Sequence, residues 1–415
     1  MKSIFTYTFV LFVALSFQLT SCAQQQKSTP KNINTEILDI QTGADRIALY
    51  LPKIKNKNIA IVANQTSVLQ VLQRVEVAPN VMGSKKITHH LVDYLYNYNT
   101  VSVQKVFAPE HGFRGKADAG ELIADGKDVK TGIPIVSLYG KNKKPSQEQL
   151  QGIDVVIFDI QDVGARFYTY ISTLHYVMEA CAEANIPVIL LDRPNPNGHY
   201  IDGPILEKEH QSFIGMHPVP VVYGMTIGEY GQMINGEKWL TNGIQCDLTV
   251  IDLKNYTHQS TYSLPIKPSP NLPNDTAINL YPSLCFFEGT PISAGRGTDK
   301  QFQIFGAPFI EKSDFSFTPK SNEGAKYPKF KNEICYGKNL QNNDYLSSLN
   351  LSWLINTYKI SPKKEFFIPF FIKLAGTKKL QQQIENGVSE IEIKASWQQG
   401  LNDFKKIRKK YLLYK

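Results

Sequence analysis

Residues 155–198, VVIFDIQDVGARFYTYISTLHYVMEACAEANIPVILLDRPNPNG, decide the fold class of this chain. The stretch opens with an apolar run at residues 155–158 and closes with a second one at residues 188–191. Between them, residues 167–181 carry apolar side chains at three- and four-residue spacing, which is the spacing of one helix face. Two strands joined by a helix through short connections pair in parallel with a right-handed crossover. The sequence therefore predicts an α/β protein.

The same pattern recurs on both sides of this stretch. Five further apolar runs have the length of strands: residues 58–63, 103–107, 135–138, 219–223 and 248–253. Two stretches have helical periodicity: residues 89–98 and 226–235. Strands and helices in alternation predict a Rossmann-like parallel sheet with flanking helices.

A boundary between two domains is expected near residues 264–274, which contain four prolines among eleven residues and cannot form a central strand or a helix interior. A chain of 415 residues also exceeds the size at which one core usually stops growing. We therefore expect a Rossmann-like domain over residues 45–260 and a smaller C-terminal α+β domain over residues 261–415. The latter ends in a strongly basic helix at residues 380–411.

The N-terminus is typical of a bacterial lipoprotein. Residues 1–21 contain one charge, Lys2, and an apolar run too short for a confident membrane span, so they predict a cleaved signal peptide. The last residues of this segment and Cys22 resemble a lipobox, in which the cysteine is lipidated. Acyl chains on Cys22 would hold the protein at the periplasmic side of a membrane, with residues 22–44 as a polar tether.

Composition excludes some classes of function. The formal net charge of +8 is a mild excess that suits an anionic ligand, but no basic and aromatic repeat or known reading motif indicates nucleic acid. The four cysteines beyond Cys22 are far apart and form no CxxC pair, so a structural zinc site is not expected.

Polar residues follow the predicted strands, and the carboxyl ends of parallel strands meet at one edge of the sheet. We expect these residues to converge there: Asn64, Glu110, His111, Tyr139, Gln161, Asp162, Asp192 and Arg193. The sequence has no G-x-G-x-x-G run, Walker A loop or H-E-x-x-H motif, so no nicotinamide cofactor and no metal are expected. A serine esterase or amidase using Ser293 or Ser172, or a sugar-binding protein without turnover, stays open as an alternative.

Carboxylates, amides, tyrosines and arginines together suit glycoside hydrolysis, in which one carboxylic acid protonates the leaving oxygen and a second group stabilises or attacks the sugar. Glu110 is the predicted acid, since it follows a strand and Pro109 fixes the backbone before it. His111 is predicted to be its hydrogen-bond partner. The second role stays open among three acids: Glu121, Asp162 and Asp192.

Seven motifs in consistent order resemble a bacterial family, the exo-β-N-acetylmuramidases, long described as a domain of unknown function. The motifs are APEHGFRG followed by AGE, FDIQDVGARFYTYISTL, DRPNPNG, YGMTIGEYG, PSPNLP and FFEGTPISAGRGT. The resemblance extends from about residue 58 to at least residue 306. It implies release of terminal β-1,4-linked N-acetylmuramic acid from peptidoglycan fragments, without a cofactor, in a cleft that the second domain closes.

The resemblance also implies which residues form the site. The family's presumed catalytic glutamate corresponds to Glu110, and we assign catalytic roles to His111, Glu121 and Asp162 as well. The predicted substrate-binding residues are Asn64, Arg114, Gln161, Arg166, Tyr168, Asp192, Arg193, Asn195, Glu288 and Arg296. The chain departs from the family at Gln65, where a proline is expected. The lactyl carboxylate of N-acetylmuramic acid would account for arginines among the acids.

Overall fold

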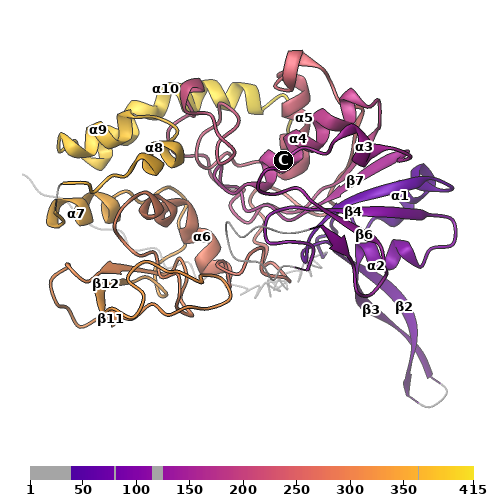
Figure 1. The fold of residues 1–415 in the computed structure, drawn as a ribbon, viewed down its shortest axis with the longest axis horizontal. Helices are drawn as coiled ribbons and strands as arrows, with labels where there is room; N and C mark the ends of the chain where they lie inside the picture. Colours follow the sequence, from indigo (N-terminus) through magenta and orange to yellow (C-terminus); the bar gives the residue numbers. More distant parts are fainter. Residues whose placement is uncertain (1–38, 79–80, 115–124, 363) are drawn as a thin grey trace, which may run out of the picture. The chain divides into compact units, whose positions relative to one another are not determined.

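The computed structural model describes all residues except 1–38, 79–80, 115–124 and 363 (Figure 1). Its central sheet has seven strands, with five parallel neighbouring pairs and one antiparallel pair at an edge. Across the sheet the strands are β5 (Gly126–Lys127), β6 (Pro134–Ser137), β4 (Ser102–Ala108), β1 (Asn58–Ala63), β7 (Val155–Asp159), β8 (Val188–Leu191) and β9 (Leu248–Ile251). The predicted α/β class and parallel sheet are thus confirmed.

The strand order reverses at the middle of the sheet. From β1 the chain adds β4 and β6 on one side, and then returns to add β7, β8 and β9 on the other. In open α/β sheets, ligands bind at such a point, outside the carboxyl ends of the strands. The loops after β1, β4, β6 and β7 all begin at this edge, which sets the position of the site described below.

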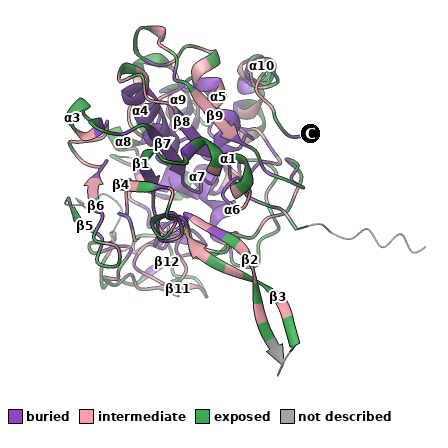
Figure 2. Cartoon of the chain, turned by 90° about the vertical axis from the view of Figure 1, so that its right-hand side faces the viewer, coloured by how far each residue is buried: buried purple, intermediate pink, exposed green. Residues whose placement is uncertain are grey.

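Helices cover both faces of the sheet because alternate side chains of each strand point to opposite faces. Ala60 and Val62 of β1 belong to one buried cluster, and Ile59 and Ile61 belong to the other. The first cluster includes side chains of α4 (Tyr170–Glu183) and α5 (Ile227–Gly236), and the second includes those of α1 (Ile47–Ile54) and α2 (Leu91–Tyr96). Figure 2 shows this buried interior between the helices. The short helices α3 (Gln147–Leu150), η1 (Lys208–His210) and η2 (Thr241–Gly243) lie in connections.

The C-terminal part is smaller and contains a three-stranded antiparallel sheet with helices. Its elements are α6 (Asp275–Leu284), η3 (Cys285–Gly289), β10 (Ile304–Ala307), β11 (Ser316–Phe317), β12 (Cys335–Asn339), α7 (Ser352–Ile360), α8 (Pro369–Ala375), α9 (Lys379–Glu385) and α10 (Glu390–Arg408). The two parts share one core: the ring of Phe167 contacts those of Tyr281 and Phe286, with centroids 5.3 and 6.0 Å away. This shared core fixes the C-terminal part against the edge of the large sheet where the strands end.

Three predicted elements differ from those observed. Residues 219–223 were predicted as a strand, but they are buried extended chain in which Val222 makes isolated bridges to Ala165 and Asp202. The predicted C-terminal helix is two helices, α9 and α10, separated by a turn around Gly387. At the predicted tether, residues 41–44 pack into the fold: Gln41 pairs with Lys254, and Thr42 and Ala44 are buried.

One prominent element was not predicted from the sequence. Strands β2 (Val68–Ala78) and β3 (Val81–His90) form an antiparallel hairpin that projects away from the central sheet (Figures 1 and 2). None of the helices in the described part of the chain has the length and hydropathy needed to cross a membrane.

Candidate active site

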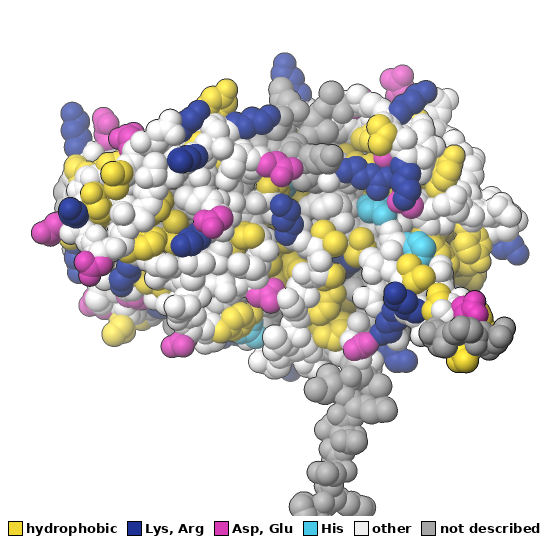
Figure 3. Space-filling model, turned by 90° about the horizontal axis from the view of Figure 1, so that it is seen from below, with side chains coloured by type: hydrophobic (Ala, Val, Ile, Leu, Met, Phe, Trp, Pro, Cys, Tyr) yellow, Lys and Arg dark blue, Asp and Glu magenta, His cyan; other side chains and the backbone are white. Residues whose placement is uncertain are grey.

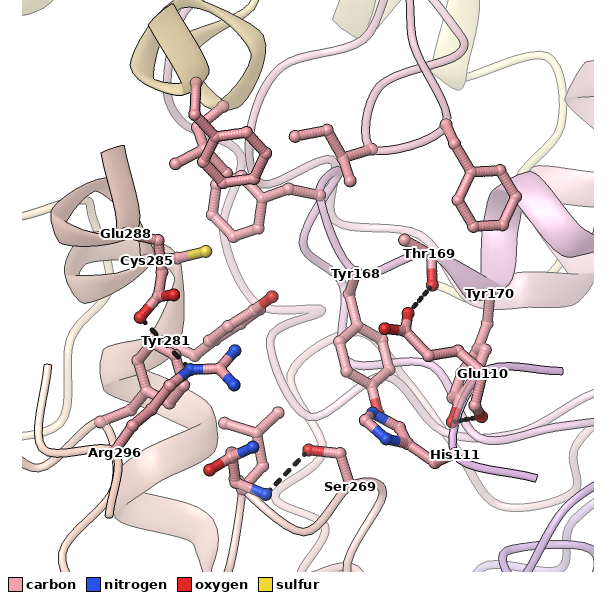
Figure 4. Close-up of a pocket in the computed structure, with 18 of the residues that line it drawn as sticks. Glu110, His111, Tyr168, Thr169, Tyr170, Ser269, Tyr281, Cys285, Glu288 and Arg296 are labelled. Atoms are coloured by element: carbon pink, nitrogen blue, oxygen red, sulfur yellow. Dashed lines mark hydrogen bonds and ion pairs between the residues drawn. The ribbon is translucent and has the colours of Figure 1, made fainter. Parts of the chain in front are cut away.

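A pocket of about 310 Å³ lies where the carboxyl edge of the large sheet meets the C-terminal part. This volume is at the lower end of the range for pockets that bind small molecules, which suits one substituted sugar. The lining from the sheet side comes from the loops after β4, β6 and β7: Glu110, His111, Tyr139, Phe167, Tyr168, Thr169 and Tyr170. The lining from the other side includes Ser269, Tyr281, Cys285, Glu288, Arg296 and Phe302 (Figure 4).

Glu110 enters the pocket because the chain turns sharply after β4. His111 and Gly112 both have left-handed backbone conformations, with φ of 69° and 76°, and Gly112 N donates to Pro109 O at 3.0 Å. A left-handed conformation is uncommon for a residue with a side chain and is found disproportionately at functional sites. The turn ends the strand abruptly and places both Glu110 and His111 on the pocket wall.

Glu110 is held by groups from the amino end of α4. Thr169 Oγ1 donates to the carboxylate oxygen Oε2 of Glu110 at 2.8 Å, and the Tyr170 hydroxyl donates to the backbone carbonyl oxygen of Glu110 at 3.4 Å. Tyr139 approaches the same carboxylate from the loop after β6: burial raises the pKa of Tyr139, and the negative charge and hydrogen bond of Glu110 raise it further. Glu110 is therefore oriented by side chains from two separate loops.

The opposite wall carries the Glu288 and Arg296 pair. Arg296 Nε lies 3.3 Å from Glu288 Oε1, and the guanidinium carbon lies 5.6 Å from the centroid of the Phe302 ring. Behind this wall, Lys329 Nζ donates to the carbonyl oxygens of Phe287 at 2.9 Å and of Thr290 at 2.6 Å. Lys329 thus holds the chain of η3 in place and adds a second positive charge beside Glu288.

Several predicted site residues lie behind the pocket instead of lining it. Asn64 Oδ1 accepts from Thr66 N at 2.9 Å, and Gln161 Nε2 donates to Pro194 O at 2.7 Å. Asp192 and Asn195 are also buried, and they bind backbone groups of Gly228 and Met225 respectively. The convergence of these loops at one edge is therefore observed, but their polar side chains support the loops rather than face the cavity.

Asp162, predicted as a catalytic acid, also lies behind the pocket, among the buried side chains that support the loops. Its Oδ2 accepts hydrogen bonds from Gly164 N at 2.7 Å and from the Tyr223 hydroxyl, whereas its Oδ1 is buried without a hydrogen-bond partner. Burial raises the pKa of Asp162 from its usual 3.8 to about 6. Asp162 does not line the pocket, and its hydrogen bonds from Gly164 and Tyr223 place it among the residues that support the loop after β7.

Three of the predicted arginines are also engaged away from the pocket. Arg114 contacts Asp128 at 2.9 Å and Asp93 at 3.2 Å, and Arg193 contacts Asp159 at 2.7 Å. The fully buried Arg166 donates to four backbone carbonyl oxygens, those of Pro204, Val219, Leu374 and Ala375. Of the predicted residues, six line the pocket: Glu110, His111, Tyr139, Tyr168, Glu288 and Arg296. Glu121 and Cys22 lie outside the described residues.

Sequence reasoning missed Thr169, Tyr170, Tyr281 and Lys329. Thr169 immediately precedes a helix, where a threonine ordinarily predicts a cap, so nothing in the sequence distinguishes it from a structural residue. Lys329 lies far along the chain from Glu288 and carries no motif. The possible serine nucleophiles, Ser172 and Ser293, are buried and do not line the pocket. The four described cysteines are free and buried.

The fold and the pocket define a class: an α/β protein with an acid, a cluster of tyrosines and an ion pair around a cavity of the size of one sugar. The N-terminal family model of the exo-β-N-acetylmuramidase NamZ matches residues 59–276, and the C-terminal family model matches residues 279–414. The chain therefore belongs to the NamZ family of exo-β-N-acetylmuramidases, which are glycosidases.

Individual relatives agree with this assignment. The peptidoglycan β-N-acetylmuramidase NamZ of Bacillus subtilis (strain 168) is 37% identical over 435 residues, which cover 98% of this chain and 99% of the relative. A crystal structure of a DUF1343 family protein from Bacteroides fragilis NCTC 9343 aligns with a TM-score of 0.80 at 46% identity, over 91% of this chain and 99% of that chain. A second DUF1343 structure from the same strain has a TM-score of 0.74 at 27% identity, with the same coverage.

Proposed function

We propose that this protein hydrolyses the bond of a terminal β-1,4-linked N-acetylmuramic acid in peptidoglycan fragments, with Glu110 as the general acid. The observation that carries the assignment of Glu110 is its position on the pocket wall, oriented by the 2.8 Å hydrogen bond from Thr169. The protonated Glu110 carboxyl would donate its proton to the glycosidic oxygen as the bond to the anomeric carbon breaks. A water molecule would add to that carbon and lose a proton to a carboxylate of the pocket.

The shape of the pocket supports an exo-acting enzyme. A cavity of about 310 Å³ accommodates one sugar with its substituents, so the bond to the next sugar would lie near the mouth. Aromatic side chains line much of the wall, among them Tyr168, Tyr281 and Phe302, and such side chains offer apolar surface to a sugar ring. Glu288 is the other described acid that lines this pocket, and it faces Glu110 across the cavity (Figure 4).

The test compares chromogenic β-glycosides of N-acetylmuramic acid and N-acetylglucosamine. We expect release of chromophore from the first and little from the second. Glu110→Gln should lower kcat by at least 10²-fold, the lower range for a general acid, with an unchanged melting temperature. Glu148→Gln, at an exposed position in α3, is the matched control and should keep full activity. Full activity of the Glu110→Gln variant would contradict the assignment of Glu110 as the general acid.

Two further measurements separate the alternative functions. A sugar-binding protein without turnover would bind muropeptides saturably and release no product even after long incubation. A serine hydrolase would lose activity with a serine-reactive phosphonate, whereas the proposed glycosidase would not.

The cellular location is part of the proposal. We propose that Cys22 is lipidated and that the protein acts on wall fragments from the periplasmic side of a bacterial membrane; the lipobox-like residues before Cys22 support this. Cells expressing the full chain and fed radiolabelled palmitate should label the wild type and not Cys22→Ala. Equal recovery of both in the soluble fraction would contradict a lipid anchor.

A further inference from the structure

We infer that Arg296 forms a carboxylate-binding subsite on the pocket wall opposite Glu110, and that this subsite binds the lactyl carboxylate of N-acetylmuramic acid. N-acetylglucosamine lacks this group, so the subsite would decide between the two sugars. The inference rests on the proposed function, because it names the group of the substrate that the pocket recognises.

Of the four arginines predicted to bind substrate, Arg296 is the one that lines this pocket. Arg114 and Arg193 are bound to aspartates, and Arg166 is fully buried among backbone carbonyl oxygens. Arg296 also forms an ion pair, with Glu288, but its side chain lies on the pocket wall and is 26% exposed. In Figure 4 its guanidinium group points into the cavity, toward the wall that carries Glu110.

The charge around Arg296 favours an anionic ligand. Glu288 contacts Arg296 through Nε at 3.3 Å, and Lys329 lies close behind the same wall with its ammonium group bound to the carbonyl oxygens of residues 287–292. The wall opposite Glu110 therefore carries two cations and the single carboxylate of Glu288, in a partly buried place where charges are weakly screened. Burial lowers the pKa of Lys329, and Glu288 opposes that effect.

The positions of Glu110 and Arg296 also fit the chemistry of the sugar. The lactyl group is attached through the oxygen on carbon 3. This carbon is two ring positions from the anomeric carbon, whose glycosidic oxygen Glu110 would protonate. A single sugar in the pocket could therefore present its glycosidic oxygen to Glu110 and its lactyl carboxylate to the opposite wall. Arginine suits this role because its planar donor groups match a carboxylate.

The decisive experiment varies the charge of the ligand and of the protein independently. The ligands are the chromogenic β-glycoside of N-acetylmuramic acid and the same compound with its lactyl carboxylate converted to the amide. For the wild type we expect kcat/KM to be roughly 10- to 100-fold higher for the charged compound, as for one charge-assisted hydrogen-bonded contact. Arg296→Gln should lower kcat/KM for the charged compound by that factor and change it less than about threefold for the amide.

Two further variants give controls. Arg296→Lys keeps the charge without the planar donors and should recover part of the discrimination. Arg74→Gln removes an exposed arginine of the projecting hairpin and should behave as the wild type. If Arg296→Gln lowers activity equally on the charged compound and the amide, Arg296 has only a structural role and the inference is wrong.

A binding measurement keeps the inference separate from the proposed function. Calorimetric titration with free N-acetylmuramic acid and with its lactyl amide requires no turnover. Tighter binding of the free acid by the wild type, lost in Arg296→Gln, would support the subsite even if no glycoside were cleaved. Equal affinity of the wild type for both compounds would overturn the subsite, whereas absence of cleavage alone would overturn only the proposed activity.

Discussion

Thr169 Oγ1 donates its hydrogen bond to Glu110 Oε2, 59 positions away, rather than to the backbone of the helix that it precedes. Thr169 occupies the N-cap position of α4, where a threonine side chain ordinarily accepts from a backbone N–H of the first turn. Helix α4 therefore lacks a side-chain cap at its amino end, and the Thr169 side chain orients the proposed catalytic acid instead. This is a consequence of tertiary structure, because Glu110 and Thr169 come from loops after different strands.

Thr169→Val tests the importance of this hydrogen bond while keeping the size of the side chain. Hydrogen bonds to charged groups contribute about 1.5–3 kcal/mol, so we expect kcat on the muramic acid glycoside to fall about 10- to 100-fold, with little change in KM. Thr169→Ser restores the hydroxyl and should recover most of the rate. Unchanged kcat in Thr169→Val would show that Glu110 is positioned by its other contacts.

Gly164→Ala should destabilise the fold through a single close contact. Gly164 has φ of 75°, and an added Cβ would lie 2.3 Å from Oδ1 of the buried Asn195. Gly152 also has φ of 75°, but nothing lies within 4 Å of the corresponding position. We expect urea unfolding to show a loss of about 1 kcal/mol for Gly152→Ala, from the backbone alone, and of about 3 kcal/mol or more for Gly164→Ala. Equal losses would mean that Asn195 moves aside without cost.

Arg166→Met should weaken the junction between α8 and the long connection from β8 to α5. Arg166 is fully buried. Its guanidinium donates hydrogen bonds to carbonyl oxygens on both sides of this junction, including those of Val219 and Ala375. Removing the guanidinium leaves buried carbonyl oxygens without a donor, which costs about 1–3 kcal/mol for each oxygen. This cost is partly offset because the substitution also removes a buried charge. We expect a net loss of about 3 kcal/mol in the free energy of unfolding. Arg74→Met, on the exposed hairpin, should stay within about 0.5 kcal/mol of the wild type.

Asp162 should make stability depend on pH. Its folded pKa of about 6 lies above its usual 3.8, so between these values the folded state holds a proton that the unfolded state has lost. The contribution of Asp162 to the free energy of unfolding is therefore fully present below about pH 4 and falls, by about 3 kcal/mol in all, as the pH rises through 6.

Asp162→Asn removes this titration. The free energy of unfolding of the variant minus that of the wild type should increase between pH 4 and pH 7, as measured by urea unfolding at several pH values. A constant difference over this range would show that Asp162 is ionised in the folded protein throughout.

Parts of the fold were readable from local patterns. The strands at residues 58–63 and 188–191 are observed with the predicted bounds, because each is a short apolar run that ends in turn-forming residues. The hairpin of β2 and β3 was not predicted, because the run VLQVLQRVEVA does not alternate strictly and the run VMGSKKITHH is mostly polar. Residues 219–223 misled the prediction because an apolar run signals burial, and burial does not require pairing in a sheet.

The sequence alone determined the α/β class, the family resemblance and the position of Glu110 after a strand, since these depend on residues close together in the chain. Only the tertiary structure decided which polar residues line the pocket. Asp162 and Glu288 are both acids beside glycine-containing loops, yet the first binds Tyr223 behind the pocket and the second pairs with Arg296 on its wall. The physical reason is that burial and charge partners are set by segments distant in sequence, and these decide whether a carboxylate supports a loop or meets a ligand.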